Sequence, residues 1–155
     1  CIRDRWQAVE AEVRALAADA RLGVLVAPNF SLGVALFTGL FAEAVRRLTP
    51  AAGFGAHLVE THHHAKKDAP SGTAMRLLAA AGQPTLPVTS VRVGQVPGTH
   101  TAIFDGRYEQ VTLTHEARDR RVFADGALTA ARWLVGRQGW FTMDDVVTDL
   151  IGSQP

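Results

Sequence analysis

The fifteen residues from Glu60 to Ala74 hold most of the side chains in this sequence that could do chemistry. They include three consecutive histidines, two lysines, two carboxylates and a Pro-Ser-Gly-Thr turn. A histidine gains or loses a proton near neutral pH, and a lysine supplies a positive charge with three hydrogen-bond donors. The combination predicts an anionic ligand that undergoes a reaction coupled to proton transfer.

The Pro-Ser-Gly-Thr turn stands where a helix is predicted to begin, at Ser71, Gly72 and Thr73. The first N–H groups of a helix have no partner inside the helix, and they lie at the positive end of its dipole. Gly72 lets a ligand approach the backbone closely. We therefore expect a carboxylate or phosphate to bind here, near Lys66 and the histidines. The plainer alternative is a turn and a helix cap without any ligand.

Elements on both sides must position this loop. Residues 55–61 predict a strand and residues 74–81 a helix ended by Gly82, and ligands of α/β folds bind at the carboxyl ends of strands.

Asp105-Gly106 predicts a hairpin. The other patterns predict helices over 6–18, 32–48 (capped by Ser31 and ended at Thr49-Pro50), 123–135 and 142–150, and strands over 22–26, 88–93, 99–105 and 108–114. The predicted class is α/β, with a mixed sheet of about four strands.

Composition excludes some classes of partner. The formal net charge is +1, which gives no reason to expect nucleic acid or an acidic membrane surface. No apolar run approaches the ~20 residues that a membrane span needs. The single cysteine, Cys1, excludes an internal disulfide and suits a reducing cytoplasm.

The three histidines also raise the question of a metal. A strand would place His62 and His64 on one side, but no cysteine or regularly spaced carboxylate completes a zinc set nearby. We therefore expect no metal, and a metal hydrolase that uses these two histidines is kept as an alternative.

The pattern Glu-x-His-His-x-x-Lys-x-Asp-x-Pro-Ser-Gly-Thr-Ala, over residues 60–74, closely resembles the signature of the 4-hydroxy-tetrahydrodipicolinate reductase family, also called dihydrodipicolinate reductase. Other segments resemble the same family in the same order: residues 26–34, 90–94, 97–100, 115–117, 123–127 and 139–143. The resemblance covers nearly the whole chain from about Trp6 onward.

The resemblance implies an NADPH- or NADH-dependent, cytoplasmic reductase of the diaminopimelate and lysine pathway, which acts on a small cyclic dicarboxylate. It also implies a homotetramer built through the sheet of the substrate domain. The matching positions are His62 as general acid/base, Lys66 as proton donor, His63, Ser71, Gly72 and Thr73 for the substrate, and Ala27, Pro28, Asn29, Phe30 and Arg120 for the cofactor. For Arg120, a surface ion pair is the alternative.

The family's Gly-rich nucleotide-binding half has no match here, because no Gly-x-Gly-x-x-Gly occurs in the 155 residues. Cys1 to Arg5 stand where the family has a glycine- and threonine-rich turn. The chain is therefore expected to be a carboxyl-terminal portion. Residues 1–31 and 121–155 would belong to a Rossmann-like nucleotide-binding domain, and residues 32–120 would form the substrate-binding and oligomerisation domain. A non-catalytic module for oligomerisation and dicarboxylate binding is the alternative.

Overall fold

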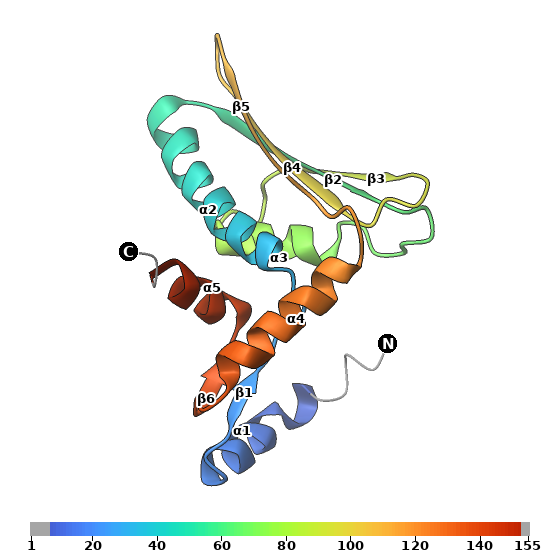
Figure 1. Cartoon of the computed structure of the whole chain (residues 1–155). Helices are drawn as coiled ribbons and strands as arrows, with labels where there is room; N and C mark the ends of the chain where they lie inside the picture. The colour runs from blue at the N-terminus through green and yellow to red at the C-terminus, as the bar shows by residue number, and fades with distance from the viewer. Residues whose placement is uncertain (1–6, 153–155) are drawn as a thin grey trace.

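The computed structural model describes residues 7–152, and its strands form two sheets (Figure 1). The larger sheet has the order β3–β2–β4–β5 and the smaller one pairs β1 with β6. β2 runs parallel to β3 and antiparallel to β4, so the four-stranded sheet is mixed, as predicted. The strands are β1 (Gly23–Leu25), β2 (Gly55–His62), β3 (Val88–Arg92), β4 (Thr99–Asp105), β5 (Gln110–Glu116) and β6 (Gly139–Phe141).

The helices lie on one side of the large sheet and around the small one. α2 and α3 cover one face of the four-stranded sheet, while the opposite face carries no helix among the described residues (Figure 1). The helices are α1 (Glu10–Asp19, after a 3-10 turn at Gln7–Val9), α2 (Leu32–Ala52), α3 (Gly72–Ala80), α4 (Arg121–Leu134) and α5 (Met143–Gly152). Trp6, the predicted start of the first helix, lies outside the described residues. None of the helices in the described range is long and apolar enough to cross a membrane.

Two apolar clusters form the core. The larger fills the space between the sheet and helices α2 and α3, and it includes Phe41, Leu58, Leu77 and Phe104, which are at most 1% exposed. Burying such a side chain stabilises the fold by about 1.5–3 kcal/mol. The smaller cluster joins α2, α4 and α5 around Met143. Side chains of β4 alternate between buried and half-buried, so one face of the sheet packs on the core.

Helix α2 begins as predicted and ends later than predicted. Ser31 Oγ accepts a hydrogen bond from the Val34 N–H at 3.2 Å, which is the expected cap. The helix continues through Pro50 to Ala52, so the predicted end at Thr49-Pro50 is wrong. Pro50 lies in the last turn, where its missing N–H removes a single helical bond. Gly53, at φ 68°, ends the helix because it adopts the left-handed conformation without a side-chain clash.

The predicted hairpin is present with a shifted second strand. β5 spans residues 110–116 instead of 108–114, because residues 106–109 form a four-residue loop closed by the Gly106 N–H on the Glu109 carbonyl at 2.9 Å. The three-residue strand β6 was not predicted. Its pairing with β1 crosses more than 110 residues of sequence, and three residues carry no periodicity that could reveal it.

Candidate functional site

A cavity of about 600 Å³ lies where the loop after β1 meets the loop after β2. Residues more than 90 positions apart in the sequence share its wall. All eleven predicted site residues line it: Ala27, Pro28, Asn29, Phe30, His62, His63, Lys66, Ser71, Gly72, Thr73 and Arg120. Val34, Asp68, Arg76, Pro97 and Phe123 complete the lining and were not predicted as site residues. The fold therefore places the predicted substrate and cofactor positions in one space.

The N-terminus of α3 forms one end of this space. The Ser71 side chain is 1% exposed; its Oγ accepts from the Ala74 N–H at 3.1 Å and lies 3.2 Å from Nε2 of His100. The hydroxyl predicted to touch the substrate is thus engaged as a helix cap. Gly72 and Thr73 follow it in the first turn, where helix N–H groups lack intrahelical partners. This end of the cavity therefore presents N–H donors of the kind that bind anions in proteins.

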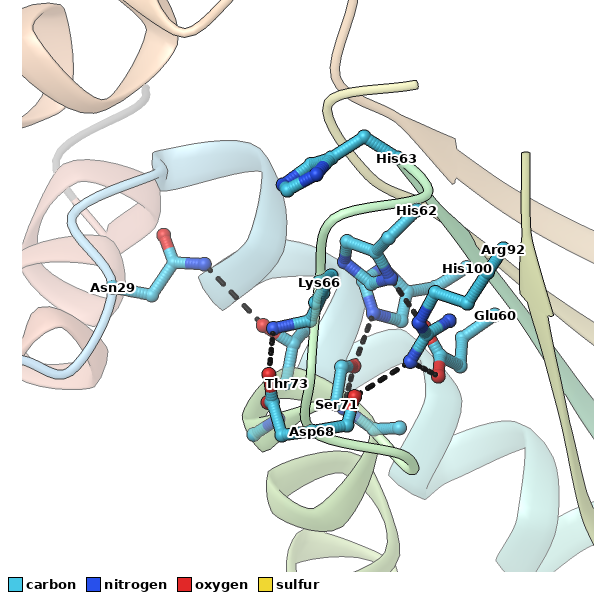
Figure 2. Close-up of polar contacts among 12 residues, drawn as sticks. Asn29, Glu60, His62, His63, Lys66, Asp68, Ser71, Thr73, Arg92 and His100 are labelled. Atoms are coloured by element: carbon cyan, nitrogen blue, oxygen red, sulfur yellow. Dashed lines mark hydrogen bonds and ion pairs between the residues drawn. The ribbon is translucent and has the colours of Figure 1, made fainter. Parts of the chain in front are cut away.

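Asp68 places its own carboxylate in that position. Lys66 Nζ donates to Asp68 Oδ1 at 2.6 Å (Figure 2). The Gly72 N–H donates to Asp68 Oδ2 at 3.3 Å. The hydrogen bond from Lys66 is the main reason why the pKa of Asp68 is lowered from its ordinary value of 3.8. A lysine ammonium and a helix N–H therefore converge on one carboxylate group.

His62 projects from the end of β2 toward the cavity, and Glu60 lies beside it on the same face. The pleat places both residues on the buried side of the strand, and Glu60 is fully buried. The carboxylate of Glu60 is hydrogen-bonded to Nδ1 of His62. A carboxylate can only accept, so Nδ1 carries the proton and Nε2 of a neutral ring is left with a lone pair. A side chain at Gly98 would meet this ring, since a Cβ there would lie 3.1 Å from Nε2.

The surroundings of His62 lower the pKa of its ring, chiefly through burial. Burial lowers the pKa of His62, and this outweighs the opposite effect of Glu60; Lys66 and Arg92 lower it further. Burial by itself would raise the pKa of Glu60, but hydrogen bonds with Arg92, Ser90 and His62 bring it below the ordinary value of 4.5. The pair therefore consists of a carboxylate and a neutral imidazole, which can take up a proton through Nε2.

His100, which sequence reasoning did not select, lies directly behind this pair. It stands opposite Glu60 in the β2–β4 ladder, and its ring is 5.3 Å from that of His62 at an interplanar angle of 77°. Burial is the main cause that lowers the pKa of His100 to about 4. Alternation along residues 99–105 could have shown that His100 points inward. Its position opposite Glu60 required the pairing of the two strands.

Glu60, His62 and His100 also form the one set of possible metal ligands among the described residues, with ligand atoms within 4.8 Å of one another. The Arg92 guanidinium lies 2.7 Å from the same Glu60 carboxylate. A metal cation would have to displace both this guanidinium and the proton on His62, which favours the hydrogen-bonded network. The alternative of a metal hydrolase relied on His62 together with His64. His64 is instead exposed, and its Nδ1 is hydrogen-bonded to the Gly94 carbonyl at 2.9 Å.

The opposite wall of the cavity is the loop after β1. Asn29 Oδ1 accepts from the Ser31 N–H at 2.8 Å, and Asn29 Nδ2 donates to Thr73 Oγ1 at 3.5 Å, so this loop touches the start of α3. Gly126 of α4 packs against the Phe30 backbone so closely that a Cβ there would lie 1.8 Å from the Phe30 carbonyl oxygen.

Arg120 approaches the cavity from the start of α4. Its Nη2 lies 3.4 Å from Nε2 of His63, and its side chain lines the same space as Phe30. Of the two alternatives weighed for Arg120, this position supports a place at the cleft.

Residues 33–147 match the family model described as dihydrodipicolinate reductase, C-terminus. The chain is also similar to two curated proteins named 4-hydroxy-tetrahydrodipicolinate reductase. The one from Methanoregula boonei is 38% identical over 155 residues, which are 88% of this chain and 60% of the relative. The one from Stenotrophomonas maltophilia is 47% identical over 123 residues, which are 78% of this chain and 50% of the relative.

A solved dihydrodipicolinate reductase from Paenisporosarcina sp. TG-14, with dipicolinate bound, has a similar fold. Its TM-score is 0.70 and its identity 24%, over 86% of this chain and 57% of that one. The chain therefore spans about half to three fifths of the length of the relatives it matches.

Proposed function

The chain belongs to the family described as dihydrodipicolinate reductase, C-terminus, and from this membership we propose that it supplies the substrate-binding part of a cytoplasmic reductase. The enzyme would reduce 4-hydroxy-tetrahydrodipicolinate to tetrahydrodipicolinate with NADPH or NADH, in diaminopimelate and lysine biosynthesis. In this proposal residues 32–120 bind the substrate and form the oligomer, and residues 1–31 and 121–155 contribute to the nucleotide-binding domain.

The position of the Asp68 carboxylate carries this proposal. Lys66 and the Gly72 N–H bind that carboxylate from two sides, and a ligand carboxylate that replaced it would meet the same two donors. His63, Thr73 and Arg120 line the cavity around this position, so a second carboxylate of a small ring also has polar partners within the same space. A cyclic dicarboxylate fits both the charge and the size of the site.

The same cavity holds two groups that exchange protons. Reduction of a C=N bond builds negative charge on the nitrogen, so a positioned donor lowers the barrier. Lys66 is the proposed donor, since its ammonium faces the cavity. His62 is the proposed general acid/base, because its proton on Nδ1 is held by Glu60 and Nε2 is free to take or return a proton. These groups favour the reductase over the alternative of a module that only binds and oligomerises.

The loop after β1 fits the nicotinamide end of the cofactor. Phe30 offers an aromatic ring and Asn29 an amide at the cavity wall, and Ala27 and Pro28 line the same wall. Arg120 adds a cation on the same side. When bound, NADPH or NADH supplies the hydride. The role of this loop is to hold the ring beside the substrate position, and the contact between Asn29 and Thr73 joins the two positions.

The uncovered face of the four-stranded sheet supports the proposed homotetramer. By the strand register this face carries Val59, Thr61, Thr89, Val91, Thr101, Ile103, Thr112 and Thr114. The row of β-branched side chains is continuous across all four strands, and no helix of residues 7–152 packs on it. A second copy of the same face would bury it symmetrically.

Calorimetric titration with pyridine-2,6-dicarboxylate tests the proposed site. We expect wild-type chain to bind, and Lys66→Ala to weaken binding about tenfold or more because a charged partner of the carboxylate is lost. Lys67→Ala is the matched control, since Lys67 is exposed and does not line the cavity; its affinity should stay within about twofold of wild type. Folded wild-type protein that fails to bind the dicarboxylate would overturn the proposal.

A further inference from the structure

Arg92, the last residue of β3, joins two parts of the site that are otherwise separate. Its Nη2 donates to Oε1 of Glu60 at 2.7 Å and to the main-chain carbonyl of Asp68 at 2.7 Å (Figure 2). The first contact reaches the carboxylate that holds His62. The second reaches the loop that carries Lys66. Both contacts come from one nitrogen of a side chain that is 18% exposed.

The strand register explains why Arg92 reaches this position. β2 and β3 run parallel, and Arg92 is the register partner of His62. Register partners point to the same face of a sheet, so the guanidinium extends under the histidine toward the buried Glu60. Nη1 is held by the Val91 carbonyl at 2.7 Å, which fixes the plane of the guanidinium.

The contacts of Arg92 leave one of its groups unsatisfied. Within residues 7–152, Nε of Arg92 is buried and has no hydrogen-bond partner. An unpaired buried donor costs about 1–3 kcal/mol. The hydrogen bonds of Nη1 and Nη2 have to offset this cost.

We propose that Arg92 is a positioning residue of the reductase site, which fixes the tautomer of His62 through Glu60 and the place of Lys66 through the Asp68 carbonyl. The inference rests on the proposed function for the roles of His62 and Lys66. The arrangement itself is independent of that function. A single guanidinium sets the proton carrier and the carboxylate-binding loop in one geometry, which keeps both ready before the ligand arrives.

Titratable or charged groups face His62 from four elements of the fold. Glu60 lies on the same strand, Lys66 on the following loop, Arg92 on β3 and His100 on β4. Removal of the Arg92 charge should raise the pKa of His62, because a nearby cation disfavours the imidazolium. Removal of the Glu60 charge should lower it. If Arg92 served only to pack the fold, its replacement would not raise the pKa of His62 while replacement of Glu60 lowers it.

The experiment is an NMR titration of the His62 ring nitrogens in the 155-residue chain. We expect wild type to show the proton on Nδ1, Arg92→Met to raise the pKa of His62, and Glu60→Gln to lower it. Arg107→Met is the matched control, since Arg107 is exposed in the β4–β5 loop and should leave the titration unchanged. Arg92→Lys keeps the charge and should restore the pKa.

Dicarboxylate affinity is the second measurement. Arg92→Met should weaken binding of pyridine-2,6-dicarboxylate about tenfold, because the loop loses its anchor, and Arg92→Lys should recover only part of it because an ammonium cannot reproduce the planar guanidinium fork. If Arg92→Met does not fold, as judged by circular dichroism, Arg92→Gln replaces it, since its amide keeps two N–H donors.

An unchanged His62 titration in folded Arg92→Met, or shifts of the same sign in Arg92→Met and Glu60→Gln, would overturn the inference. Absence of dicarboxylate binding by wild type would instead count against the proposed function, and the His62 titration would still decide the role of Arg92. The two failures are therefore distinguishable.

Discussion

The carboxylate of Asp68 lies 2.6 Å from the ammonium of Lys66 and occupies the position that the start of α3 offers to an anion. The lysine is thus paired with a carboxylate of its own chain. In the proposed function, a ligand carboxylate would displace Asp68 to meet Lys66 and the Gly72 N–H. Binding would then be an exchange of one carboxylate for another, and its free energy would be reduced by the contacts that Asp68 gives up.

Substitution of Asp68 should therefore strengthen dicarboxylate binding. We expect Asp68→Ala to raise the affinity for pyridine-2,6-dicarboxylate about tenfold, since the competing carboxylate is removed while both donors remain. Titration calorimetry measures the effect. Asp125→Ala, an exposed acid of α4, removes the same charge away from the cavity and should change the affinity by less than about twofold. A weaker affinity in Asp68→Ala would mean that Asp68 orders the loop instead of competing with the ligand.

The stability of the fold should fall as the pH is lowered from about 6.5 to 4. His100 has a pKa of about 4 in the folded chain against 6.5 as its ordinary value. Between these two pH values His100 is therefore protonated in the unfolded chain and neutral in the folded chain, which favours unfolding. The stabilisation is complete above pH 6.5 and is lost on acidification, on the order of 3 kcal/mol from this residue. Burial lowers the pKa of His62 and His115 as well, so both act in the same direction.

Urea unfolding at pH 7.5, 6.5, 5.5 and 4.5 measures this dependence. His100→Gln should flatten it, because one of the buried imidazoles no longer has to remain neutral. His57→Gln is the control, since His57 projects from the opposite face of the sheet, where it bonds to Thr89, and it should keep the wild-type slope. A free energy of unfolding that stays constant over this range would contradict the prediction.

Replacement of two helical glycines by alanine should change the free energy of unfolding in opposite directions. A Cβ added at Gly39 of α2 would enter open space, so Gly39→Ala should raise the free energy of unfolding by about 0.5–1 kcal/mol through the better helix propensity of alanine. A Cβ at Gly126 would lie 1.8 Å from the Phe30 carbonyl oxygen. Gly126→Ala should therefore lower the free energy of unfolding by about 2 kcal/mol or more. Urea unfolding of both variants is the test, and stabilisation by Gly126→Ala would show that the contact with Phe30 is loose.

A bulky charge on the uncovered sheet face should dissociate the proposed tetramer. Thr101 lies near the middle of this face, where Thr114 of β5 is 3.2 Å away. In analytical ultracentrifugation we expect wild type to sediment with about four times the 16.6 kDa of one chain, and Thr101→Arg with a lower mass, because the interface would contain an unpaired charge. Thr148→Arg on the exposed side of α5 should sediment like wild type. Monomeric wild type at ~100 μM would contradict an interface on this face.

Features that depend on neighbouring residues were predictable from the sequence. Ser31 was predicted to cap a helix and does so, and Ser71, predicted to contact the substrate, takes the role of the helix cap that was the alternative. The β4–β5 hairpin also followed from a local signal, the Asp105-Gly106 pair. Pro50 shows the limit of such signals, because the packing of α2 on the sheet carries the helix past the proline.

The sequence by itself determined which chemical groups the site contains, because His62, His63, Lys66 and the start of α3 lie within one short stretch and their types dictate proton exchange and anion binding. Only the tertiary structure decided how they are coupled. The contacts of Glu60 with Arg92 and of His62 with His100 cross from β2 to its two neighbouring strands. These contacts depend on strand order and register, which the global packing of the sheet selects and no local pattern encodes.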